Sequence, residues 1–109
     1  VDKILAREQG NYDVSILDIH AESTSEKIAL ALYFDGRINV IFGTHTHVQT
    51  NDAQVLEGKC AYITDLGMCG SQAGVLGVRS EEVIRKLKFL QQEQQFQKKI
   101  SKKFLIKKF

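Results

Sequence analysis

The chain has 109 residues, of which 43% are hydrophobic and 26% are charged, a composition typical of one small soluble domain. No apolar run approaches the roughly 20 residues of a membrane-spanning helix, and the start at Val1 lacks the apolar core of a signal peptide. Two cysteines, Cys60 and Cys69, are too few for the disulfide framework of a small secreted protein. These features predict a cytoplasmic protein without a membrane partner.

The formal net charge of +2 conceals a segregation of charge along the chain. Residues 1–85 carry a net charge of −5, whereas residues 86–109 carry eight lysines and one glutamate, a net charge of +7. We therefore expect a folded segment over residues 1–85 and a Lys/Gln-rich tail, helical or disordered, over residues 86–109. Such a tail can attract nucleic acid, although a lysine-rich helix more often presents a solvated face.

Regular structure is expected only after the first dozen residues, which are polar and end in the turn signal Gly10-Asn11. The run 14–19 is short and mostly apolar, which is typical of a buried strand. This predicted strand stops at His20.

A helix is predicted to follow over residues 27–35. Ser23 and Glu26 form a capping box before it, in which each side chain bonds the backbone N–H of the other residue. Gly36 stands where a left-handed residue commonly ends a helix. Helical spacing predicts an apolar face of five residues, Ile28, Ala29, Ala31, Leu32 and Phe34.

A second, β-branched strand is predicted at 38–42, where Gly43 interrupts it, and a third at 60–64. The helix between the first two strands makes them parallel, so both end at the same edge of the sheet. That edge therefore brings His20 close to the loop 43–47.

A glycine-rich, irregular stretch at 70–78 precedes a second predicted helix, which begins at Ser80. Apolar residues keep helical spacing along it, first Val83, Leu87 and Leu90, and then Phe96, Ile100 and Phe104.

All three histidines of the chain, His20, His45 and His47, lie at the predicted carboxyl edge of the sheet. Ligands of open α/β sheets bind at this edge. On a loop, the two rings of a His-x-His pair can point to two metal ions a few ångströms apart. A lone histidine is usually structural, but the convergence of all three predicts a metal site.

Four motifs occur in an order and at separations that resemble the carboxy-terminal half of the YmdB-like metallophosphoesterases: DIHAESTSEK at 18–27, FDGR at 34–37, GTHTHVQT at 43–50 and AYITDLGM at 61–68. The resemblance extends over about residues 13–87. It implies an α/β fold, here a partial layered α/β sandwich of the calcineurin-like phosphoesterase type. The basic C-terminal helix, which the composition and apolar spacing predict, is appended to this fold and departs from the family. The resemblance also implies phosphodiester substrates, notably 2′,3′-cyclic nucleotides.

The same resemblance implies a role for each histidine. His20 and His45 would bind one divalent metal ion, and His47 would bind a second. Iron, manganese and zinc all accept imidazole ligands, so the identity of the metal stays open. Two such ions can bind the phosphate oxygens and activate water for attack on phosphorus.

Several other polar residues lie near this edge. Asp18 shares a strand face with His20 and can support it. Asp65 ends the third strand and either faces the site or serves a turn. Thr44 and Thr46 either bond phosphate or shape the loop.

The family's remaining ligands belong to its amino-terminal half, and no Gly-Asn-His or Asn-Gly-Glu-Asn string occurs in this sequence. Three histidines without carboxylates cannot complete two metal sites. We therefore expect a fragment of a metal-dependent phosphodiesterase or phosphatase that is inactive alone, as in a truncated, frame-shifted or split gene product. Its partner would be a separate amino-terminal half or a second copy of itself. The alternatives are a catalytically inactive remnant and a binding module that acts through the basic tail, residues 86–109.

Overall fold

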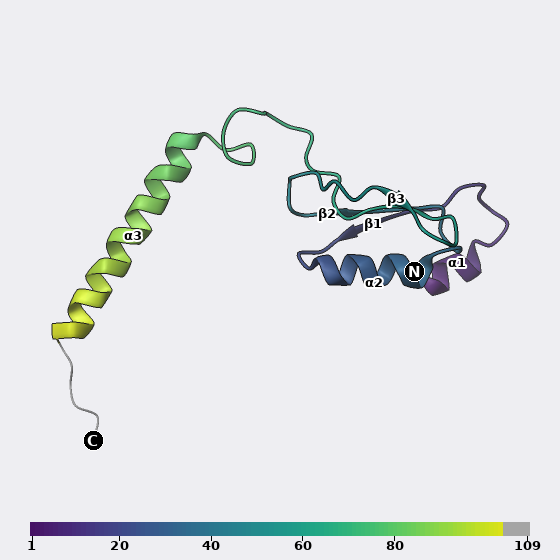
Figure 1. Ribbon diagram of the computed structural model, residues 1–109, viewed down its shortest axis with the longest axis horizontal. Helices are drawn as coiled ribbons and strands as arrows, with labels where there is room; N and C mark the ends of the chain where they lie inside the picture. The colour runs from purple at the N-terminus through teal and green to yellow at the C-terminus, as the bar shows by residue number, and fades with distance from the viewer. Residues whose placement is uncertain (104–109) are drawn as a thin grey trace, which may run out of the picture. The chain divides into compact units, whose positions relative to one another are not determined.

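The computed structural model describes the backbone of residues 1–103 and the side chains of residues 1–95. The chain divides into two compact units, of which the first is Val1–Cys69 and the second begins at Gly70. The first unit is a small α/β domain. Its elements are α1 (Asp2–Arg7), β1 (Ile16–His20), α2 (Thr24–Phe34), β2 (Val40–Thr44), β3 (Gln54–Val55) and β4 (Ala61–Ile63) (Figure 1).

The four strands form one mixed sheet in the order β1-β2-β4-β3. β1 and β2 are parallel, as expected for strands joined by a crossover helix. β4 is parallel to β2, and β3 pairs with β4 in the antiparallel sense. In the register of β1 and β2, His20 lies opposite Thr44. Both strands therefore end at the same edge of the sheet.

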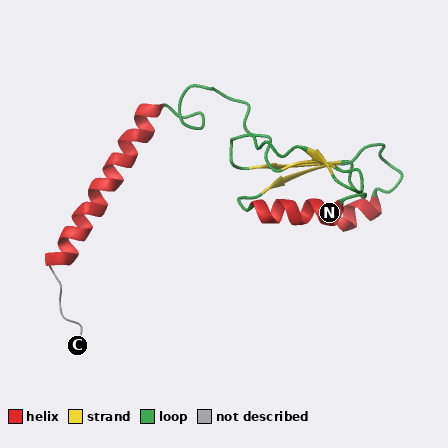
Figure 2. Cartoon of the chain, in the orientation of Figure 1, coloured by secondary structure: helices red, strands yellow, loops and turns green. Residues whose placement is uncertain are grey.

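Helix α2 runs along one face of the sheet (Figure 2). Its start confirms one half of the predicted capping box, because the backbone N–H of Glu26 donates to Ser23 Oγ over 3.4 Å. Its end confirms the role of Gly36, which follows the last helical turn with φ +77°. The helix begins three residues earlier than predicted, at Thr24.

The apolar face predicted for this helix is confirmed at Ala31 and Phe34, which are buried, and is wrong at Ile28 and Leu32. Ile28 and Leu32 are 41% and 62% exposed. The buried row consists of Ala31 and Phe34 together with Lys27, which was not expected, and it faces the sheet. The hydrophobic core unites α2, the strands and the loops before them, and comprises Ile19, Ala31, Phe34, Ile38, Ile41, Cys60 and Tyr62.

Two elements were not expected from the sequence. The first is α1, which shows that regular structure begins well before Gly10. Asp2 in this helix pairs with Arg37 and accepts a hydrogen bond from Tyr33, and Leu5 packs against the core. These contacts hold a helix of six residues, which is too short for its sequence to predict. The second is β3, whose two residues are too few to give a pattern.

Gly43 does not interrupt β2 as expected, but pairs with β1 inside the strand. A Cβ atom at this position would lie 1.9 Å from the carbonyl oxygen of Thr64 and 2.6 Å from Cδ of Lys27. Only glycine allows this close approach. β2 therefore continues to Thr44, directly before His45.

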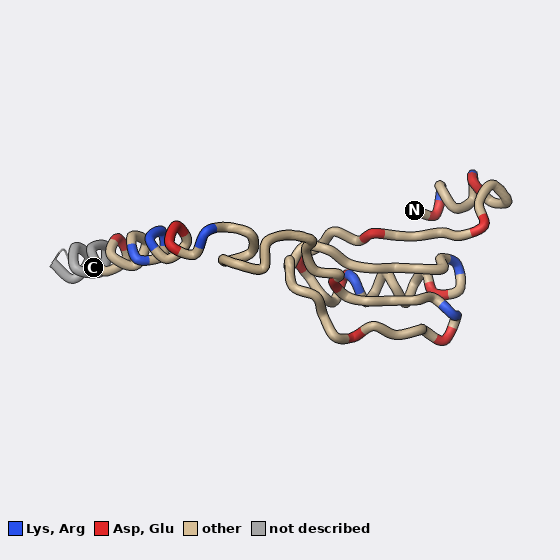
Figure 3. Tube along the Cα trace, turned by 90° about the horizontal axis from the view of Figure 1, so that it is seen from above, with Lys and Arg blue, Asp and Glu red and all other residues tan. Residues whose placement is uncertain are grey.

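The second unit contains α3 (Ser80–Lys103), which begins at the predicted residue. In its described part, Glu81 and Glu82 precede the basic residues Arg85, Lys86 and Lys88, and Arg85 pairs with Glu82. Figure 3 colours the acidic and basic residues red and blue. The side chains of Phe96 and Ile100, and all of Phe104, lie outside the described residues. No helix in the described part of the chain is both long and apolar enough to cross a bilayer.

Candidate metal centre

Two of the three histidines meet at the carboxyl edge of the sheet. His20 is the last residue of β1, and His45 follows the last residue of β2. Their ring centroids lie 5.2 Å apart, with an angle of 75° between the ring planes. Both side chains are exposed at this edge. The parallel pairing of two short strands thus joins residues that are 25 positions apart.

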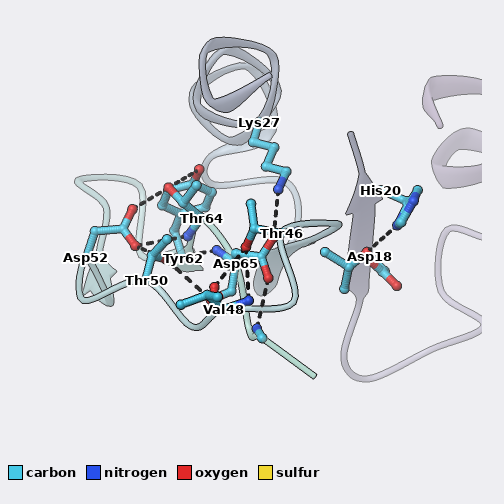
Figure 4. A network of polar contacts seen from close by, with 12 residues as sticks. Asp18, His20, Lys27, Thr46, Val48, Thr50, Asp52, Tyr62, Thr64 and Asp65 are labelled. Atoms are coloured by element: carbon cyan, nitrogen blue, oxygen red, sulfur yellow. Dashed lines mark hydrogen bonds and ion pairs between the residues drawn. The ribbon is translucent and has the colours of Figure 1, made fainter. Parts of the chain in front are cut away.

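The His20 ring is held by a chain of two hydrogen bonds that crosses from β1 to β2 and back. Its Nδ1 lies 3.0 Å from Oγ1 of Thr44. The same hydroxyl donates to Oδ1 of Asp18 over 2.9 Å. Asp18 and His20 project from one face of β1, as strand alternation requires, and are drawn together in Figure 4. The expected support of His20 by Asp18 therefore passes through Thr44.

The loop after β2 has an unusual backbone. His45 and His47 have φ angles of +141° and +63°, a region that residues other than glycine seldom adopt. Each such residue costs about 1–3 kcal/mol and needs support from the surrounding structure. Within the loop, Oγ1 of Thr46 donates to the carbonyl oxygen of Val48 over 2.8 Å. Thr46 therefore shapes the loop.

Further support comes from a buried carboxylate beneath the loop. Oδ2 of Asp65 accepts the backbone N–H of Thr46 over 3.0 Å and an ammonium proton of Lys27 over 3.0 Å (Figure 4). Its Oδ1 accepts the backbone N–H of Gly67 over 2.8 Å. The side chains of Lys27 and Asp65 are 1% and 0% exposed. Asp65 therefore holds the histidine loop through its backbone. Of the two interpretations of Asp65, the structure supports the one in which it stabilises a turn.

Burial alone would raise the pKa of the Asp65 carboxyl. The backbone N–H groups of Thr46 and Gly67, together with the ammonium group of Lys27, outweigh that effect and hold this pKa well below its usual range. Asp65 is therefore a carboxylate at neutral pH, and its charge balances that of Lys27.

A second polar cluster holds the segment that follows the loop. Oδ1 of Asp52 accepts a 2.6 Å hydrogen bond from the hydroxyl of Thr50 and a 3.2 Å bond from the backbone N–H of Thr64. The hydroxyl groups of Tyr62 and Thr64 are 3.0 Å apart. Burial raises the pKa of the Tyr62 phenol, so this side chain stays neutral. The cluster joins the segment around Asp52 to β4.

The arrangement of His20 and His45 fits two ligands of one metal ion. Metal–imidazole bonds of about 2 Å bring the rings of two histidines that share an ion to a separation of this order. The donor set is nevertheless incomplete. Among the described residues, no three His, Cys, Asp or Glu side chains gather closely enough to hold a metal ion. His47 lies two residues beyond His45 on the same loop and is exposed.

Sequence reasoning missed the contribution of Lys27, whose carbon chain lies against Gly43 and whose charge pairs with Asp65. One feature of the sequence could have predicted the burial of Lys27. Lys27 shares a helical row with Ala31 and Phe34, so burial of that row also buries the lysine. Its partner is 38 positions away, and no local pattern indicates such a pair.

Comparison with known proteins gives concordant matches. The protein family described as "YmdB-like protein" matches residues 1–108. The 2′,3′-cyclic-nucleotide 2′-phosphodiesterase of Bacillus subtilis is 46% identical over 87 residues, which are 80% of this chain and 33% of that protein. The chain thus spans about a third of the length of this curated relative.

Two crystal structures resemble the fold. A hypothetical protein from Thermus thermophilus matches with a TM-score of 0.70 and 42% identity, over 79% of this chain and 33% of the other. A novel phosphatase from Mycoplasma pneumoniae matches with a TM-score of 0.63 and 45% identity, over 76% of this chain and 31% of the other. The four-stranded α/β domain is therefore part of a larger fold in both.

Proposed function

The chain belongs to the YmdB-like family, and from this premise we propose that it supplies the histidine ligands of a metal-dependent phosphodiester hydrolase. The observation that carries the proposal is the approach of the His20 and His45 rings to 5.2 Å at the carboxyl ends of neighbouring parallel strands. Two imidazoles so placed are suited to a single divalent cation.

In this proposal, His20 and His45 hold one ion and His47 contributes to a second. Iron, manganese and zinc are all compatible with imidazole nitrogen. When bound, such ions neutralise phosphate charge and lower the pKa of water. The protein's own contribution is to fix the ring of His20 from β1 and β2 and to hold the strained loop of His45 and His47 over Asp65.

The missing ligands come, in this proposal, from residues outside the described part of the chain. They are supplied by further sequence in the same polypeptide or by a separate amino-terminal half. The substrate class follows from the Bacillus subtilis relative, whose name specifies 2′,3′-cyclic nucleotides. We propose phosphodiesters of this kind as substrates.

The test is hydrolysis of bis-p-nitrophenyl phosphate and of 2′,3′-cyclic AMP in the presence of Mn²⁺. The chain is assayed alone and after co-expression and co-purification with the amino-terminal part of the Bacillus subtilis relative. We expect hydrolysis by the co-purified complex only. His45→Ala should reduce the rate at least a hundredfold, because it removes a metal ligand.

The control is Glu57→Gln, an exposed carboxylate in the turn before β4, at the opposite edge of the sheet. It should leave the rate unchanged. A co-purified complex that hydrolyses neither compound would contradict the proposal and favour a catalytically inactive remnant.

A further inference from the structure

The hydrogen bonds around His20 specify where its ring proton lies. A threonine hydroxyl has one proton to donate, whereas a carboxylate can only accept. The hydroxyl of Thr44 is 2.9 Å from Oδ1 of Asp18 and 3.0 Å from Nδ1 of His20. Because Asp18 takes the only hydroxyl proton, the Thr44 oxygen must accept from the ring. This arrangement requires a proton on Nδ1 of His20.

The opposite arrangement leaves a bond unmade. If Nδ1 lacked a proton, the Thr44 hydroxyl would have to choose between that nitrogen and Asp18, since it cannot donate to both. The chain from Asp18 through Thr44 to His20 is fully satisfied in only one direction. That direction leaves the lone pair of His20 on Nε2.

We propose that Asp18 and Thr44 are positioning residues that fix the tautomer of His20 and so present Nε2 to a divalent cation. This inference rests on the proposed function. A histidine ligand commonly donates its second ring N–H to a neighbouring group, and loss of that group costs roughly 10–100-fold in metal affinity. Here the neighbouring group is a hydroxyl, which a carboxylate orients in turn.

The backbone brings these three side chains together. His20 and Thr44 are opposite each other in the register of two paired strands, and Asp18 is two residues before His20 on the same face. All three side chains thus stand on strands rather than on the strained loop. The position of Nε2 is thereby set by the sheet.

The experiment is a long-range ¹H–¹⁵N correlation spectrum of the metal-free full chain with labelled histidine, recorded at about pH 8, where histidine is ordinarily neutral. His20→Gln assigns the signals of this ring. In the wild type we expect a proton-bearing Nδ1 and a bare Nε2. Thr44→Val should shift the ring toward the Nε2-protonated form, and Asp18→Ala should do so in part because it releases the hydroxyl proton for Nδ1.

Thr44→Ser keeps the hydroxyl and should preserve the wild-type tautomer of His20. Thr24→Val is the control, because it alters an exposed threonine outside this chain of hydrogen bonds, and it should also leave the tautomer unchanged. A His20 ring that is protonated on Nε2 in the wild type would by itself overturn the inference. So would a Thr44→Val spectrum with the wild-type tautomer.

A second readout separates this inference from the proposed function. Free Mn²⁺, counted by electron paramagnetic resonance during titration of the co-purified complex, gives the affinity of the site. Thr44→Val should weaken it at least tenfold and Thr44→Ser should restore it. A complex that binds no Mn²⁺ but has the proton of His20 on Nδ1 would contradict the proposed function and support the inference about the tautomer.

Discussion

At the scale of single residues, the proximity of His20 and His45 was predictable from the sequence. The contacts that hold these two histidines in place were not. Two parallel strands joined by a helix must end at one edge, so the sequence alone places His20 near the loop 43–47. The Lys27–Asp65 pair joins positions 38 residues apart and follows no local pattern. Likewise, alternation predicts that Asp18 supports His20, but the sequence does not reveal Thr44 between them.

The buried pair gives a prediction about stability and pH. Asp65→Asn leaves the Lys27 ammonium buried without its counter-charge and should lower the free energy of unfolding by about 3–5 kcal/mol. Because the pKa of Asp65 is lower in the folded chain than its ordinary value near 3.9, the wild type has this stabilisation above about pH 4 and loses it progressively at lower pH. Urea unfolding between neutral pH and about pH 3 measures the loss.

The matched control is Asp13→Asn, an exposed carboxylate in the loop before β1, which should change stability at neutral pH by less than about 0.5 kcal/mol. If Asp65→Asn were as mild as this control at neutral pH, the buried pair would not support the histidine loop.

At the scale of elements, three of the four strands and both longer helices were predictable in kind, but the buried face of α2 was predictable only in part. Nearly every residue from Ile28 to Phe34 is apolar, so helical periodicity in this stretch is weak. The choice of face depends on burial of Lys27 over Asp65, a long-range contact. α1 and β3 were missed because their six and two residues are too few to give a periodic pattern.

The observed buried face of α2 predicts unequal costs for two truncations on the same helix. Phe34 is 3% exposed and Leu32 is 62% exposed. Phe34→Ala should lower the free energy of unfolding by about 3–5 kcal/mol, because it leaves a cavity in the core. Leu32→Ala should change it by less than about 0.5 kcal/mol. Chemical denaturation of the full chain measures both free energies of unfolding. Equal losses for the two variants would mean that Leu32 is buried like Phe34, as the sequence predicted, and would contradict the structure.

At the scale of the whole molecule, the described fold leaves apolar side chains uncovered on both sides of its first unit. Leu32 and Tyr33 on α2 are 62% and 59% exposed, and Val14 and Ile16 at β1 are 61% and 64% exposed. The chain spans about a third of the relatives it matches. Exposed apolar surface of this kind marks contact sites, which supports the proposed assembly with a completing segment. The predicted division at residue 85, which was drawn from charge alone, stays a prediction, as does a cytoplasmic location.

The most direct test of the account is the metal content of the co-purified complex, measured by elemental analysis for the wild type and three single variants. His20→Ala and His45→Ala should lower the content to the same extent, since both rings serve one ion. His47→Ala should lower the content through the other ion. Equal metal content in the wild type and all three variants would contradict the central claim that these histidines are metal ligands.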